Sequence, residues 1–182
     1  MSAQGLLTWT TRSLELLWLL TVFLVPLAFV NRGDILSASA ISYLEVPKIA
    51  VLRTLVSLMA VLWLIEWGLQ GRPSLSSFLS GRLASTSMRW LFLAVVLYLA
   101  SVLLSTAFSA SFAVSLWGQV PGEDGYAAYT IISYIILFAI VSTHLKTRPQ
   151  IWRLMGAIIL TGVVTSAFAM MQNYGYDPFD LR

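Results

Sequence analysis

Five long runs of apolar residues, separated by short polar segments, dominate the chain. They cover about residues 14–30, 49–69, 90–108, 126–144 and 151–172. The hydrocarbon core of a bilayer needs roughly 20 apolar residues of helix, because every backbone polar group must be bonded within the segment. The pattern predicts an all-α fold, a single polytopic membrane domain over residues 1–182 with five transmembrane helices. The connections are too short for a soluble domain.

The first run follows Arg12, so it also has the features of a secretory signal with Ala38-Ser39-Ala40 as its cleavage site. A signal core has about 7 to 15 apolar residues, and this run is longer, with the small-residue triplet far downstream. We expect an uncleaved membrane anchor.

Lysine and arginine are unevenly divided between the two predicted sides of the membrane. One side holds Arg12, Arg72, Arg82, Arg89, Lys146, Arg148 and Arg153, and the other holds Arg32, Lys48, Arg53 and Arg182. Because basic residues gather on the cytoplasmic side, the N-terminus is predicted in the cytoplasm. Five spans then leave the C-terminus outside, in the periplasm if the protein is bacterial.

Composition agrees with a membrane protein and removes several functional classes. Hydrophobic residues make up 58% of the chain and charged residues 10%, and the mean hydropathy is +0.82. The net charge of +3 is explained by orientation, so no nucleic-acid partner is expected. The chain has no cysteine and one histidine, His144, so neither a metal nor a cofactor site is predicted. No motif for a catalytic residue is recognisable.

Charged residues inside predicted spans are candidates for function. Glu15 follows Arg12 by one helical turn, a spacing that predicts an ion pair between them. Arg53 and Glu66 share the second run but lie about 140° apart around a helix and roughly 20 Å along it, so they cannot pair. Both can extend to the headgroups. Alternatively, Arg53 with Lys48 and Arg32 binds an anionic lipid headgroup at the outer leaflet.

Three further segments carry local signals. The stretch after Pro73 has Leu75, Phe78, Leu79 and Leu83 at helical spacing, which predicts a helix in the interface or an ordinary loop. Ser109 to Gly125 reads as a turn-rich outer loop, with Trp117 at the interface. Gly162 and Ser166 predict a close approach between helices.

Several segments together resemble the early part of the O-antigen ligase and polymerase-like membrane proteins. They read Leu104-Ser105-Thr106-Ala107-Phe108-Ser109, Ser115-Leu116-Trp117-Gly118 with Gly125, Glu45-Val46-Pro47-Lys48, and Gln172-Asn173-Tyr174-Gly175-Tyr176-Asp177-Pro178-Phe179. The resemblance runs in order over about residues 15 to 180.

The resemblance implies a metal-independent glycosyltransferase of the bacterial inner membrane. Such proteins transfer a glycan from a polyprenyl diphosphate carrier to an acceptor at the periplasmic face, and their catalytic loop follows the part matched here. We therefore expect the chain to be the N-terminal part of a longer protein, whose C-terminal half would be its partner. The expected substrate-binding residues are Arg32, Lys48, Arg53, Trp117 and Asp177.

Other interpretations stay open. Asp177 precedes Pro178, a position that favours a turn residue over a ligand for a sugar hydroxyl. The whole chain could also be a complete small membrane protein without chemistry of its own, an assembly or transport subunit that contacts membrane lipids. A half-transporter would need broken helices and an internal repeat, and the sequence has neither.

Overall fold

The computed structural model describes residues 3–28, 40–69, 86–118 and 126–175. All regular secondary structure in these ranges is helical, which confirms the predicted all-α class. The helices are α1 (Ala3–Leu27), α2 (Ala40–Leu69), α4 (Thr86–Ala107), α5 (Phe112–Trp117), α6 (Ala128–His144) and α7 (Arg148–Asn173).

Four of these helices are long and apolar enough to cross a membrane. Their qualifying segments are Gln4–Leu27, Glu45–Leu69, Arg89–Ala107 and Arg148–Asn173. The fourth predicted span, residues 126–144, corresponds to α6, a shorter apolar helix of 17 residues. That length is the lower limit for a spanning helix. The chain therefore has the helices of a multi-pass membrane protein.

The first two helices begin earlier than the apolar runs that predicted them. The helix α1 begins at Ala3 and α2 at Ala40, whereas the runs begin near residues 14 and 49. In α1, the hydroxyls of Thr8, Thr10 and Thr11 donate to backbone carbonyls of the preceding turn, so these polar residues continue the helix. Hydropathy marks the part of a helix that suits lipid and not the ends of the helix.

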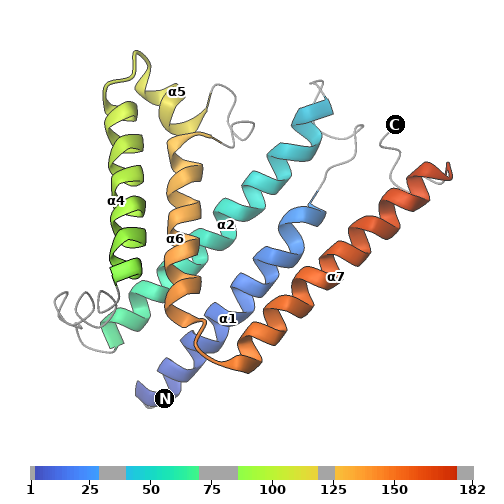
Figure 1. Ribbon diagram of the computed structural model, residues 1–182, viewed down its shortest axis with the longest axis horizontal. Coiled ribbons are helices and arrows are strands. Elements are labelled where there is room, and N and C mark those ends of the chain that lie inside the picture. The colour runs from blue at the N-terminus through green and yellow to red at the C-terminus, as the bar shows by residue number, and fades with distance from the viewer. Residues whose placement is uncertain (1–2, 29–39, 70–85, 119–125, 176–182) are drawn as a thin grey trace.

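The long helices α1, α2, α4, α6 and α7 alternate in direction and form an open bundle (Figure 1). The helix α1 lies between α2 and α7, and α6 packs on α2 and α1, while α4 and α5 contact α6. The starts of α1, α4 and α7 share one end with the ends of α2 and α6. We call this the basic end, because it holds Arg12, Arg89, Lys146, Arg148 and Arg153. Lys48 and Arg53 lie toward the opposite end.

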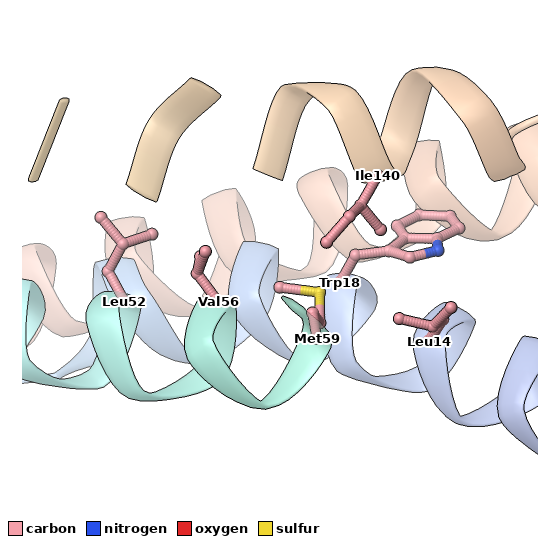
Figure 2. Close-up of a cluster of buried hydrophobic side chains, with 6 residues drawn as sticks. All are labelled: Leu14, Trp18, Leu52, Val56, Met59 and Ile140. Atoms are coloured by element: carbon pink, nitrogen blue, oxygen red, sulfur yellow. The ribbon is translucent and has the colours of Figure 1, made fainter. Parts of the chain in front are cut away.

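The packed centre of the bundle is formed by α1, α2 and α6 (Figure 2). Its buried side chains are Leu14 and Trp18 of α1, Leu52, Val56 and Met59 of α2, and Ile140 of α6. The spacings of three and four residues place each set on one face of its helix. By contrast, α4 and α7 leave most of their apolar side chains exposed. Exposed apolar faces of this size are suited to contact with lipid.

One predicted loop is partly helical. Residues 112–117, within the segment expected to be a turn-rich loop, form α5. The helix ends at Gly118, whose φ of 100° is a conformation that favours glycine and whose N–H bonds the carbonyl of Val114 at 2.8 Å. Residues 119–125 and the predicted interfacial helix after Pro73 lie outside the described residues.

Candidate functional site

The guanidinium of Arg53 is held between two neighbouring residues of α6. Its Nε and Nη2 donate to Oγ1 of Thr130 at 3.2 Å and 2.5 Å. Its Cζ lies 4.9 Å from the centroid of the Tyr129 ring, in cation–π geometry. Because Arg53 is only half-buried, the guanidinium has a fixed position and still presents donors outward.

Two more side chains complete this group. The Tyr129 hydroxyl lies 3.4 Å from Oγ of Ser57, which is one turn after Arg53 on α2. The Trp117 ring of α5 packs against Tyr129, with ring centroids 5.1 Å apart. We call Arg53, Ser57, Trp117, Tyr129 and Thr130 the Arg53 cluster. Three helices thus bring one cation, two aromatic rings and three hydroxyls into one group.

A small polar pocket lies on the other side of α5. It has a volume of about 230 Å³ and is bounded by α4, α5 and the start of α6. Five hydroxyl-bearing residues line it: Ser101, Ser105, Thr106, Ser115 and Tyr126. The hydroxyls of Ser115 and Thr106 are 3.4 Å apart. Hydroxyl groups both donate and accept, so this lining can bind a polyhydroxylated ligand.

The structure brings together two of the five residues proposed from the sequence for substrate binding. Arg53 and Trp117 both contact Tyr129. Lys48 is half-buried on α2, about 140° around the helix from Arg53, so it lies on a different face. Arg32 and Asp177 lie outside the described residues. Tyr129, Thr130 and Ser57 had no sequence signal, because their role depends on where α6 packs against α2.

Glu66 lies in a second polar site, near the basic end, instead of extending to the headgroups. Its Oε2 is 2.8 Å from Nε2 of His144, and both side chains are about nine-tenths buried. Nδ1 of His144 is 2.8 Å from the Ile140 carbonyl and from Oγ1 of Thr143. The imidazole therefore joins the last turn of α6 to the last turn of α2. A cation at a helix C-terminus is favoured by the dipole, whereas a carboxylate there needs compensation.

Glu15 pairs with a different arginine from the one expected. Its Oε1 accepts from Nε of Arg153 on α7 at 2.6 Å, and its Oε2 accepts from Nε2 of Gln150 at 3.3 Å. The predicted pairing with Arg12 is wrong, because α7 packs against the face of α1 that carries Glu15. Oε1 of Gln150 also accepts from the backbone N–H groups of Lys146 and Thr147 at 3.0 Å. Gln150 thereby fixes the turn between α6 and α7 to α1.

The predicted close approach at Gly162 and Ser166 is also not observed. A Cβ atom added at Gly162 would meet no atom within 4 Å, and Ser166 is exposed. The buried residue of α7 is instead Thr161, whose hydroxyl reaches the Val22 carbonyl of α1 at 3.4 Å.

Comparisons of this chain with protein-family models, with curated proteins and with solved structures find no match. Within the described ranges, no three histidine or acidic side chains are grouped so that they would hold a metal ion.

Proposed function

We propose that this chain is the N-terminal membrane part of an O-antigen ligase-like glycosyltransferase of the bacterial inner membrane. In this proposal the Arg53 cluster binds the diphosphate of a polyprenyl-linked glycan at the periplasmic face. The observation that carries it is the position of the Arg53 guanidinium, which is fixed by Thr130 and Tyr129 while the side chain stays partly exposed.

The chemistry of the cluster supports this ligand. A planar guanidinium forms paired hydrogen bonds with phosphate oxygens and keeps its charge at any physiological pH. When a glycan leaves its carrier, negative charge grows on the diphosphate, and fixed donors stabilise that charge. Trp117, about half exposed beside Tyr129, offers an aromatic face. The hydroxyl-lined pocket on the other side of α5 supplies partners for sugar hydroxyls.

Charge distribution supports the side of the membrane. The described arginines and lysines are concentrated at the basic end, and the Arg53 cluster lies toward the opposite end. The positive-inside rule then puts the basic end in the cytoplasm and the cluster outside. Membrane-embedded apolar groups beside the cluster would hold the polyprenyl chain.

A binding experiment tests the proposal. The chain, reconstituted in phosphatidylcholine nanodiscs, is titrated with a polyprenyl diphosphate and with the corresponding polyprenol. We expect Arg53→Gln to weaken diphosphate binding about tenfold, since a hydrogen bond to a charged group contributes about 1.5 kcal/mol or more. Polyprenol binding should not change. Arg148→Gln, an exposed arginine at the basic end, is the matched control. Equal binding of the diphosphate by wild type and Arg53→Gln contradicts the proposal.

The alternative function, a non-enzymatic assembly or transport subunit, predicts a different phenotype. If the gene is deleted in its source organism, the proposed function requires carrier-linked glycan to accumulate. Wild-type protein should restore transfer and Arg53→Gln should not, although it inserts normally. Normal glycan transfer in the deletion strain would favour the subunit.

A further inference from the structure

A long groove runs between α1 and α7 on the side of the bundle away from the Arg53 cluster. Its apolar lining comes from Leu16, Leu19, Leu20 and Phe23 of α1 and from Ala157 and Leu160 of α7. On α1 these positions follow the spacing i, i+3, i+4 and i+7, so they form one continuous face. The groove has a volume of about 640 Å³, within the range of small-molecule sites.

Two contacts between the helices limit this groove and hold α7 against α1. At the basic end, Glu15 binds Arg153 and Gln150. Eight residues further along α7, about 12 Å, Thr161 donates to the Val22 carbonyl. The groove is therefore formed by helices that are joined on either side of it, and the small side chain of Ala157 contributes to its depth.

Among the described residues that line the groove, the charged ones, Arg12, Glu15 and Arg153, lie at its basic end. Arg12 continues the same face of α1 one turn before Leu16, and its side chain is exposed. The Arg153 guanidinium is about half exposed and uses two of its nitrogens for Glu15. Since Glu15 is neutralised by this pair, the end of the groove carries one excess positive charge. Arg12 and the remaining donors of Arg153 are suited to phosphate oxygens.

We infer that this groove binds one anionic phospholipid, with its phosphate on Arg12 and Arg153 and an acyl chain along α1 and α7. The match is one of charge and shape, because an apolar groove that ends in two arginines complements an amphiphile with an anionic head. This site is independent of the proposed glycan transfer, since it lies on other helices and at the other end of the bundle.

Lipid titration followed by native mass spectrometry tests this inference on the full chain in detergent. Wild type should bind dioleoyl phosphatidylglycerol more tightly than dioleoyl phosphatidylcholine. Arg12→Gln should reduce that preference about fivefold, which corresponds to about 1 kcal/mol for one arginine near a headgroup. Arg12 is the suitable position because its replacement keeps the Glu15–Arg153 pair. Arg148→Gln removes a charge at the same end of α7 without touching the groove, so it should retain the preference.

The position of the lipid is tested by photocrosslinking. A phosphatidylglycerol with a diazirine on its acyl chain should label peptides containing residues 16–23 and 157–160. Ala157→Phe, which fills the groove, should reduce this labelling for both lipid classes. Equal affinity for the two lipids in the wild type would overturn the inference, as would equal losses in Arg12→Gln and Arg148→Gln. Photolabelling confined to α4 would also overturn the inference. The same holds if the groove is a dimer contact, in which case Ala157→Phe would disrupt a dimer without changing lipid binding.

Discussion

Three charged side chains within the helices, Glu15, Arg53 and Glu66, each have a polar partner on another helix. Glu15 binds Arg153, Arg53 binds Thr130, and Glu66 binds His144. A charge removed from water is costly unless it is paired and hydrogen-bonded, so each of these contacts fixes the position of two helices relative to each other. These polar pairs therefore allow fewer relative positions of the helices than apolar contacts do.

The Glu66–His144 pair gives a stability prediction. We expect His144→Leu to lower the free energy of unfolding by about 3 kcal/mol, because it leaves the buried Glu66 carboxylate without its imidazole. The double variant Glu66→Leu/His144→Leu should lose less, since the buried carboxylate is removed together with the imidazole. Denaturation in detergent, followed by circular dichroism, measures both. A double variant that is less stable than His144→Leu would contradict this account.

Sequence reasoning could locate these charges but did not identify their partners. Glu66 and His144 are 78 residues apart, and Arg53 and Thr130 are 77 apart. Helical periodicity relates residues on one helix only, which is why it favoured Arg12 as the partner of Glu15. One signal was available for the second site. Glu66 and His144 each fall in the last turn of a different apolar run, and both runs end on the same predicted side of the membrane. A contact between the two side chains was therefore possible.

At the scale of the helices, hydropathy located the five apolar helices because the requirement for backbone hydrogen bonding in lipid is local. It did not find their packing faces. Gly162 and Ser166 were expected to contact a neighbour, yet Thr161 makes that contact. Small residues permit close packing on any face, and only the neighbouring helix decides which face is used. The short helix α5 was missed because six residues are too few for a clear period.

The packing of α7 on α1 can be tested with cysteine pairs, because the natural chain has no cysteine. Val22→Cys/Thr161→Cys should be joined within one chain by a short bifunctional thiol reagent, since the two positions meet across the helices. Val22→Cys/Val102→Cys, which places the second thiol on α4, is the control and should not be joined. Efficient crosslinking of the control pair would show a different arrangement of the helices. So would a failure to crosslink Val22→Cys/Thr161→Cys, provided that each of the two cysteines reacts with a monofunctional thiol label.

At the scale of the whole molecule, the bundle separates two kinds of site. The basic end carries most of the described cationic residues, with the Glu66–His144 pair and the charged end of the lipid groove nearby. The opposite end carries the Arg53 cluster and the hydroxyl-lined pocket beside α5. The proposed function requires the Arg53 cluster to face the periplasm.

Accessibility labelling in intact cells tests that requirement most directly. Single cysteines are introduced at Ser111, an exposed residue just before α5, and at Lys146, an exposed residue at the basic end. With a membrane-impermeant maleimide, Ser111→Cys should be labelled in intact cells, and Lys146→Cys only after the membrane is permeabilised. The reverse pattern would place the Arg53 cluster in the cytoplasm and would contradict its proposed role in binding a glycan carrier at the outer face.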